Sequence, residues 1–205
     1  ISYIIEHYPE NTEFVVTVGY YADHVKQLLN LVYPDKDIKF CEVDKYKGKG
    51  SSLVYSINCA KNLLQKPFIL HVCDTIIIEP FEIPSGNWCA SCVRSHTEHY
   101  RTHHVLNGKL TKINEKGALD SNLAHIGLVR VEDYKDFWEE VQNLLDTYPD
   151  DSSLSDCHAI NGMIHKGKSF KIVKINQWLD IGNIQSLHDT RKAMTEKLNI
   201  LDKDD

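Results

Sequence analysis

The chain has 205 residues, a length that suits one domain of moderate size with a substantial core. Hydrophobic residues make up 42% and charged residues 25%, close to the soluble globular average, which excludes disordered and fibrous classes. No apolar run approaches the ~20 residues that a membrane helix needs. The formal net charge is −6 and no stretch of Lys and Arg forms a basic face, so neither a membrane nor a nucleic acid is an expected partner.

The six cysteines mostly lie inside apolar runs, as buried free thiols do. Cys89 and Cys92 form the one C-x-x-C motif, inside the predicted strand 87–95. Residues three apart on a strand point to opposite faces, which suits neither a zinc knuckle nor a redox pair. The first residues, ISYIIEHYPE, lack the features of a secretory signal. We therefore expect reduced cysteines and a cytoplasmic protein.

The first part of the chain alternates strands with helices. The runs FVVTV and PFILHV are apolar, and PFILHV is apolar enough to be covered on both faces. Between them, apolar residues recur at helical spacing in 22–33 and from Leu53 to Leu64. The strands are expected at 14–18, 38–43 and 67–72.

The second part begins with several strands in succession. Strands are predicted at 87–95, 103–114 and 123–131, and Asn107-Gly108 is a strong two-residue hairpin signal. An amphipathic helix with Asp133 as N-cap is expected at 131–145. A short helix, a strand and a closing helix follow at 158–167, 170–175 and 183–198.

The alternating pattern predicts a single α/β domain over residues 1–205, with no repeat or linker. We expect a three-layer α/β/α sandwich with a mostly parallel, Rossmann-like sheet. Its main strands are predicted at 14–18, 38–43, 67–72, 123–131 and 170–175. Ligands of such sheets bind beyond the carboxyl ends of the strands.

Two aspartates are predicted to lie at that edge. Asp74 ends the most apolar strand, where a carboxylate is costly to desolvate without a cation or hydrogen-bond donors. Asp180 follows the strand 170–175, within WLDIG. Magnesium is usually held by one or two carboxylates together with substrate phosphates, so the two could form such a pair. An N-cap or turn role for Asp74 is an equally simple interpretation.

Three further features are candidates for a site. The loop KGKGSSL includes Gly48 and Gly50, which let the backbone approach a ligand, and Ser51 and Ser52, which open a helix; a plain tight turn would look the same. Glu115-Lys116 ends the hairpin, and a lysine there could take a phosphate. Four histidines cluster in SHTEHYRTHH, but such turn residues are expected to be solvated rather than to bind a metal. They are His96, His99, His103 and His104.

With these residues in view, the chain resembles the sugar-phosphate nucleotidyltransferase family. This family includes nucleoside-diphosphate-sugar pyrophosphorylases and small choline-phosphate cytidylyltransferases. The motifs that carry the resemblance occur in family order over nearly the whole chain: VGYYADHV, GKGSSL, LHVCDT, INEK, AHIGLVRV and WLDIG. WLDIG is the nearest match, whereas Cys73 stands where the family has glycine. His125 and Ile126 precede Gly127 in the strand that the family uses around its sugar.

The resemblance implies a fold of the nucleotide-diphospho-sugar transferase type and a role for each motif. Asp74 and Asp180 would hold Mg²⁺, and Lys116 would be catalytic with them by steadying the acceptor. Gly48, Gly50, Ser51, Ser52 and Asp74 would bind the nucleotide, and Glu115, Lys116 and Gly127 would bind the acceptor. An acceptor phosphate oxygen would attack the α-phosphorus in line and release pyrophosphate. No β-helical extension follows WLDIG, which favours the compact enzymes of surface-polysaccharide or phospholipid head-group pathways.

The family's glycine-rich loop with Arg and Lys, which follows its first strand, has no counterpart in this sequence. The resemblance implies that this loop belongs upstream of Ile1, in a βα unit of roughly thirty to forty residues. Since that strand is central in the family's sheet, a chain lacking it would have two exposed inner edges.

The implied partners are a nucleoside triphosphate and a small phosphorylated acceptor, and a homo-oligomer is left open. Two other functions stay open. A glycosyltransferase of the related nucleotide-sugar-binding fold would need Asp-x-Asp after the strand 67–72, where Cys73-Asp74-Thr75 stands. A non-catalytic regulatory subunit would account for Cys73 and the missing loop. The sequence does not identify the base or the acceptor.

Overall fold

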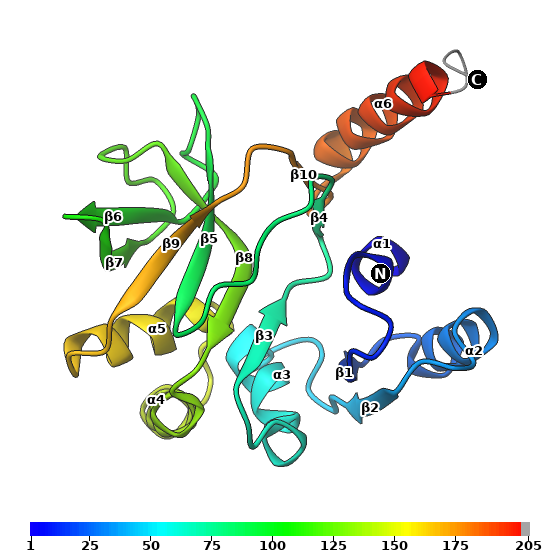
Figure 1. The fold of residues 1–205 in the computed structure, drawn as a ribbon. Coiled ribbons are helices and arrows are strands. Elements are labelled where there is room, and N and C mark those ends of the chain that lie inside the picture. Colours follow the sequence, from blue (N-terminus) through cyan, green and yellow to red (C-terminus); the bar gives the residue numbers. More distant parts are fainter. Residues whose placement is uncertain (202–205) are drawn as a thin grey trace.

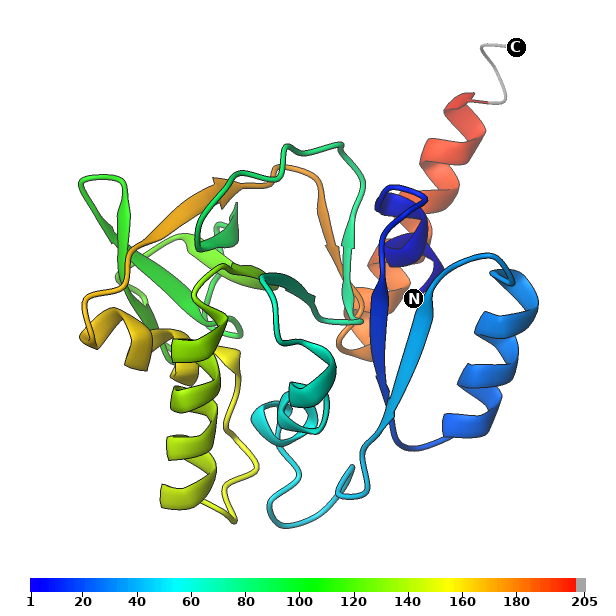
Figure 2. The ribbon, with the colours of Figure 1, turned by 60° about the horizontal axis from the view of Figure 1, so that its bottom comes forward.

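The computed structural model describes residues 1–201 of the chain (Figures 1 and 2). The first half contains these elements: α1 (Ser2–His7), β1 (Phe14–Val18), α2 (Ala22–Val32), β2 (Ile38–Glu42), α3 (Leu53–Cys59), η1 (Lys61–Leu63), β3 (Phe68–His71), β4 (Thr75–Ile77) and β5 (Trp88–Val93). The second half contains β6 (Thr102–Leu106), β7 (Lys109–Asn114), β8 (Leu123–Val131), α4 (Tyr134–Thr147), α5 (Asp156–His165), β9 (Phe170–Lys174), β10 (Trp178–Asp180) and α6 (Ile184–Leu201). The strands and helices predicted from the sequence are present, with ends that differ by a few residues.

Strands β1 and β2 form a parallel pair in register from Phe14 opposite Ile38 to Val18 opposite Glu42. The crossover between them is α2, whose apolar residues recur on one face, as a parallel connection requires. In Figure 2 this β1–α2–β2 unit lies to one side of the larger sheet.

The larger sheet has six strands in the order β3-β8-β5-β9-β7-β6. An additional pairing of Thr102 in β6 with Ala124 in β8 closes five of them into a ring. Among the described strands only β1–β2 and β5–β9 pair in parallel, and the other pairings are antiparallel. The α/β class is confirmed, whereas the prediction of a mostly parallel, Rossmann-like sheet is not.

The reason for the mixed pairing lies between β5 and β8. No helix is present between Val93 and Leu123, so the chain has no crossover that could return it to the same end of the sheet. It instead inserts the β6–β7 hairpin and runs back antiparallel to both β3 and β5. The hairpin turn at Asn107 and Gly108 has positive φ at both residues, the backbone that the Asn-Gly pair favours.

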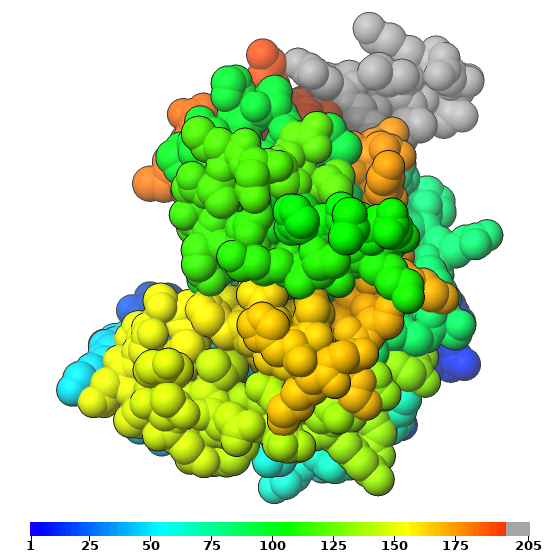
Figure 3. Space-filling model, turned by 90° about the vertical axis from the view of Figure 1, so that its left-hand side faces the viewer, coloured from blue at the N-terminus to red at the C-terminus, as the bar shows by residue number. Residues whose placement is uncertain are grey.

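Two clusters of buried apolar residues pack against this sheet. One lies under α3, α4 and α5 and includes Cys89, Phe137 and Phe170. The other includes Trp88, Cys92 and Trp178. Cys89 and Cys92 thus belong to different clusters, as their spacing on a strand predicts, and both are free thiols. On the face shown in Figure 3, the β6–β7 hairpin lies beside the segment from α4 to β9.

One local prediction was wrong, and another was confirmed in position only. The helix expected from Leu53 to Leu64 ends at Cys59, and a short 3-10 turn follows. Asp133 occupies the N-cap position of α4 but makes no capping bond, because its carboxylate accepts from the Asn87 side chain instead. Within residues 1–201, no helix combines the length and apolar character needed to cross a membrane.

Strands β3 and β8 approach each other closely where β3 ends. Gly127 has φ +70°, and the backbone N–H of Val72 donates to its carbonyl oxygen at 2.9 Å. A Cβ on Gly127 would lie 2.1 Å from Cγ2 of Val72. Glycine at this position therefore lets β3 run directly into the Asp74 turn.

We expect Gly127→Ala to destabilise the fold by about 3 kcal/mol or more, because a left-handed backbone and overpacking add together. Gly108→Ala is the matched control: its φ is +73°, but no atom lies within 4 Å of the added Cβ. It should cost only about 1–2 kcal/mol. Urea unfolding measures both, and adding Val72→Ala should restore part of the Gly127→Ala loss. Equal losses for the two glycine variants would contradict the close approach.

Candidate functional site

A cavity of about 1620 Å³ lies along β1 and β3. Residues of both strands line it, together with residues of α1, α3 and β8. Within the described residues, β1 pairs only with β2 and β3 only with β8. The two strand edges that face this cavity are thus unpaired within the described residues.

Asp74 and Asp180 meet at one end of the cavity. The antiparallel pairing of β4 with β10 sets Asp180 opposite Thr75, and the backbone N–H of Ile181 donates to the carbonyl oxygen of Asp74 at 2.9 Å. Oδ2 of Asp74 and Oδ1 of Asp180 each lie 3.1 Å from the point where a Cβ on Gly182 would sit. The two oxygens are therefore no more than twice that distance apart. The structure brings this predicted pair together.

Several contacts fix the Asp180 side of the pair. Its Oδ1 accepts from the N–H of Gly182 at 2.8 Å, and its Oδ2 accepts from the Tyr100 hydroxyl at 3.1 Å. The Thr190 hydroxyl donates to its carbonyl oxygen at 2.9 Å. Tyr100 is a residue that the sequence did not assign to the site, because it comes from an irregular segment with no motif of its own.

The charges around Asp74 are unbalanced. Partial removal from water raises the pKa of Asp74, and the nearby Asp180 carboxylate raises it further, while Lys116 opposes them. Asp74 still reaches solvent through the cavity. Two carboxylates that face one point with one lysine nearby leave room for an added cation.

Lys116 and Glu115 behave differently. Lys116 is exposed and lines the cavity. Glu115 is held elsewhere: its Oε2 accepts from Nε of Arg101 at 3.0 Å, and its Oε1 lies 3.3 Å from Nε2 of His158. Gly127 also lines the cavity, next to Val72. Of the predicted acceptor residues, Lys116 is the one with a side chain available to a ligand.

A second cavity of about 380 Å³ lies between the ends of β1 and β2 and the loop 47–53. Ser51 and Ser52 line it, and the Ser52 hydroxyl caps α3 by accepting from the N–H of Tyr55 at 3.1 Å. Gly48 is exposed with φ +85°, and no atom is within 4 Å of an added Cβ. Gly50 is different: it is buried at φ +77°, and a Cβ there would lie 2.7 Å from the Pro149 carbonyl oxygen. Gly50 thus packs against the 149–150 segment. Replacing Gly50 with valine would disturb folding, so that variant would not report on nucleotide binding.

The four clustered histidines separate in the structure. His96, His99 and His104 are exposed, as expected. The prediction was wrong for His103, which is fully buried because β6 turns it into the sheet interior. It lies in a polar chain with His125 and Asp156, two residues to which the sequence analysis gave no functional role.

A half-buried histidine, His71, supports the turn that carries Asp74. The Tyr8 hydroxyl donates to Nδ1 of His71 at 3.0 Å, and Nε2 of His71 donates to the Thr75 carbonyl oxygen at 3.1 Å. The neutral His71 ring can make both hydrogen bonds. Burial lowers the pKa of His71 to about 4.

No protein-family model and no curated protein matches the chain. Solved structures do. The CTP:phosphocholine cytidylyltransferase from Streptococcus pneumoniae is similar with a TM-score of 0.71 at 14% identity, over 95% of this chain and 82% of that one. The inositol-1-phosphate CTP transferase from T. maritima has a TM-score of 0.68 at 17% identity, over 90% and 75% of the two chains.

A UDP-glucose pyrophosphorylase, solved in complex with UDP-glucose, has a TM-score of 0.70 at 17% identity, over 95% of this chain and 86% of that one. At these identities the similarity establishes the fold alone. The chain has the α/β fold of nucleotidyltransferase structures, which agrees with the fold implied by its sequence motifs.

The His71 contacts predict an acid-dependent loss of stability. Because the folded-state pKa is lowered from 6.5 to about 4, stability is fully present above pH 6.5 and is lost as the pH falls from 6.5 to 4. Replacement by glutamine removes this titration. The free energy of unfolding of His71→Gln, measured by urea titration, should therefore fall less over that interval than that of the wild type. The exposed His96→Gln serves as control, and identical pH profiles for wild type and His71→Gln would refute the assignment.

Proposed function

We propose that this protein is a nucleotidyltransferase. It transfers a nucleoside monophosphate from a nucleoside triphosphate to a sugar 1-phosphate or a phosphocholine-like acceptor and releases pyrophosphate. The observation that carries the proposal is the convergence of Asp74 and Asp180, from opposite halves of the chain, on one point at the end of a large cavity. The similarity of the fold to nucleotidyltransferase structures supports it.

The residues present fit a divalent cation. Two carboxylate oxygens face the same point, and the Asp180 charge makes the ionised state of Asp74 less favourable. Hard oxygen donors of this kind suit Mg²⁺, which is usually bound by one or two carboxylates plus substrate phosphates. Asp74 and Asp180 would hold the ion, and the ion would act as a Lewis acid on the α-phosphate and neutralise developing charge.

The other steps follow from the chain's own residues. Lys116 lies near enough to Asp74 to affect its pKa, so its ammonium group can hold the acceptor phosphate beside the metal ligands. One acceptor phosphate oxygen then attacks the α-phosphorus as the bond from this phosphorus to the bridging oxygen breaks, and pyrophosphate leaves. Tyr100 keeps Asp180 oriented through its hydroxyl group. The catalytic contribution of the protein is therefore positioning and electrostatic stabilisation.

We assign the nucleotide base to the second cavity. Ser51 and Ser52 of the loop border it at the carboxyl ends of β1 and β2, which is where ligands of α/β sheets bind. The Ser51 hydroxyl is the loop group best placed for contact: it lines the cavity, and its oxygen can accept while its proton is donated to the Gly48 carbonyl oxygen at 2.6 Å. Gly50 is buried and Ser52 is occupied as a cap. The acceptor would lie on the opposite side, near Lys116 and Gly127, with Glu115 holding Arg101 in place.

We infer a Mg²⁺-dependent enzyme that acts in the cytoplasm on a polysaccharide or head-group precursor.

The full-length protein tests the function directly. The four nucleoside triphosphates are each combined with sugar 1-phosphates and with phosphocholine in the presence of Mg²⁺, and pyrophosphate release is followed. At least one pair should turn over well above the background of the Asp74→Asn variant. A protein that binds a triphosphate yet releases no pyrophosphate with any acceptor would be a non-catalytic relative, and the proposed activity would be wrong.

The aspartate pair yields a sharper prediction. Asp74→Asn and Asp180→Asn should each lower turnover by about 100-fold or more, because the lost interaction acts in the transition state. Neither should lower the unfolding temperature much, since one of two mutually repelling charges is removed. The exposed Asp189→Asn is the control of equal charge change.

Gly182→Ala provides an independent variant that keeps both charges. Its Cβ would be 3.1 Å from both carboxylates, and the φ of Gly182 is not in the left-handed region. It should raise the Mg²⁺ concentration needed for half-maximal activity by about tenfold or more, a change of roughly 1.4 kcal/mol in metal binding. Unchanged metal dependence in this variant would show that the point between the two carboxylates holds no ion.

A further inference from the structure

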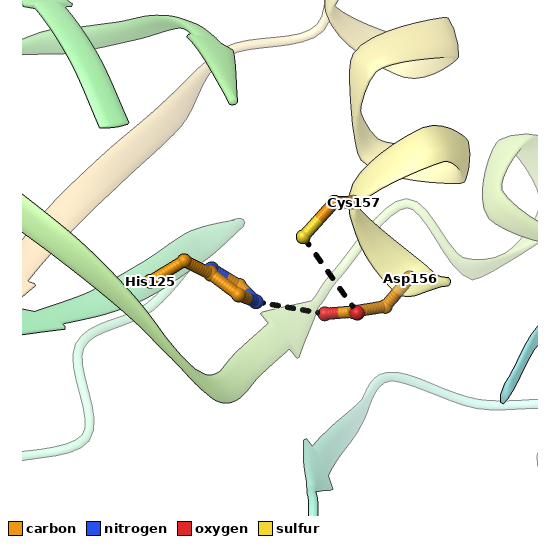
Figure 4. A group of neighbouring side chains, drawn as sticks. All are labelled: His125, Asp156 and Cys157. Atoms are coloured by element: carbon orange, nitrogen blue, oxygen red, sulfur yellow. Dashed lines mark hydrogen bonds and ion pairs between the residues drawn. The ribbon is translucent and has the colours of Figure 1, made fainter. Parts of the chain in front are cut away.

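A second group of potential ligand atoms lies away from the aspartate pair. His125 of β8 points toward Asp156 and Cys157 at the start of α5 (Figure 4). One ligand atom from each residue lies within 4.8 Å of the others. Among the described residues, His125, Asp156 and Cys157 are the three His, Cys, Asp or Glu side chains that converge in this way. The His125 and Asp156 side chains are only 7% and 4% exposed.

The ring of His125 is oriented by a contact of its second nitrogen, Nδ1. Nδ1 of His125 lies 2.8 Å from Nε2 of His103, and Nδ1 of His103 contacts the Ser91 hydroxyl. His103 is fully buried, and burial together with His125 lowers its pKa well below the ordinary value. Neutral His103 can accept the Nδ1–H of His125 and donate its own proton to Ser91. This is the kind of supporting bond that metal-binding histidines make through their second nitrogen.

That arrangement leaves Nε2 of His125, which faces Asp156, to bind either a proton or a metal ion. The distance from this nitrogen to Oδ2 of Asp156 is 3.0 Å. Two electron-pair donors this close need a positive centre between them, either a proton or a metal ion. Tetrahedral zinc spaces its ligand atoms roughly 3.3–3.7 Å apart. Nε2 of His125 lies 3.0 Å from Oδ2 of Asp156, and Sγ of Cys157 lies 3.8 Å from Oδ1 of the same carboxylate, distances close to this spacing.

The donor types and the charge favour zinc over a hard cation. Imidazole, thiolate and carboxylate together are a borderline-soft set, unlike the all-oxygen set of Asp74 and Asp180. A carboxylate and a thiolate carry two negative charges, which one Zn²⁺ neutralises inside a buried site. Arg101 is a neighbouring cation, but its guanidinium group is engaged by Glu115.

The group also has an accessible side. His125, Asp156 and Cys157 all line the large cavity, on which Tyr100 and Arg101 also open. A metal ion with three protein ligands there would have a fourth position toward the cavity, as catalytic zinc sites do. From this geometry we propose that His125, Asp156 and Cys157 bind one Zn²⁺ ion whose fourth coordination position faces the cavity. The site is separate from the Asp74–Asp180 pair and does not depend on the proposed activity.

Metal binding by the full-length protein tests the proposal without any assay of turnover. Protein stripped with a chelator and dialysed against zinc should retain one equivalent, measured by elemental analysis. Cobalt in place of zinc should give a thiolate-to-cobalt charge-transfer band. Cys157→Ser should lose the band and most of the zinc, and His125→Gln should lose most of the zinc. Cys92→Ser, a buried cysteine on the other face of the sheet, should keep both, as should Asp74→Asn.

Thermal unfolding keeps the test decisive if a variant folds poorly. Zinc at a hundredfold excess over its Kd should raise the Tm of the wild type by about 5–10 °C, and a chelator should reverse the shift. A wild type that retains no zinc, shows no thiolate band and has an unchanged Tm would overturn the proposal. So would equal zinc binding by folded Cys157→Ser. In either case a proton, rather than a metal ion, joins His125 to Asp156.

Discussion

The pairing of two three-residue strands is the contact on which the site depends. Strands β4 and β10 come from opposite halves of the chain, and their antiparallel register sets Asp180 opposite Thr75. The bond from the N–H of Ile181 to the Asp74 carbonyl oxygen continues the pairing to the residue that carries the other carboxylate. Because backbone hydrogen bonds fix both ends, the two like charges are held together at a cost that the rest of the fold must offset.

The elements around this pairing position its two strands. Gly127 allows β3 to approach β8 closely, and His71 holds the turn after β3 by bonding to Thr75. On the other side, the Arg94 guanidinium donates to the Trp178 carbonyl oxygen at 2.7 Å and covers the indole ring. The large sheet therefore positions these strands, and the candidate catalytic carboxylates lie at its edge.

Much of this could be predicted from the sequence, for identifiable reasons. Long apolar strands and the Asn107-Gly108 turn leave clear patterns, and Asp74 was visible because it interrupts the most apolar run. Strands as short as β4 and β10 have no periodicity, so only the strand-end positions of Asp74 and Asp180 and the resemblance indicated that the two would meet. The direction of β8 was missed because alternation of apolar runs does not reveal whether a crossover helix is present.

The buried polar chain was missed for a different reason. His103 belongs to a run of polar residues that is typical of a turn, and His125 sits in an otherwise apolar strand. Only the pairing of β6 with β8 places the two rings 2.8 Å apart, nitrogen to nitrogen. Such contacts depend on register between strands distant in sequence, which neither composition nor spacing encodes.

The closure of five strands into a ring has a consequence for how the molecule opens. A closed ring has no terminal strand from which to fray, so its amide hydrogens should exchange with solvent only through large unfolding events. The β1–α2–β2 unit is attached outside the ring, with one strand edge unpaired along the cavity. Its amides should exchange through smaller openings, on a shorter timescale than those of β5 and β8. The half of the molecule that borders the loop 47–53 is therefore the half with the lower local stability, and adjustment to different bases would be least costly there.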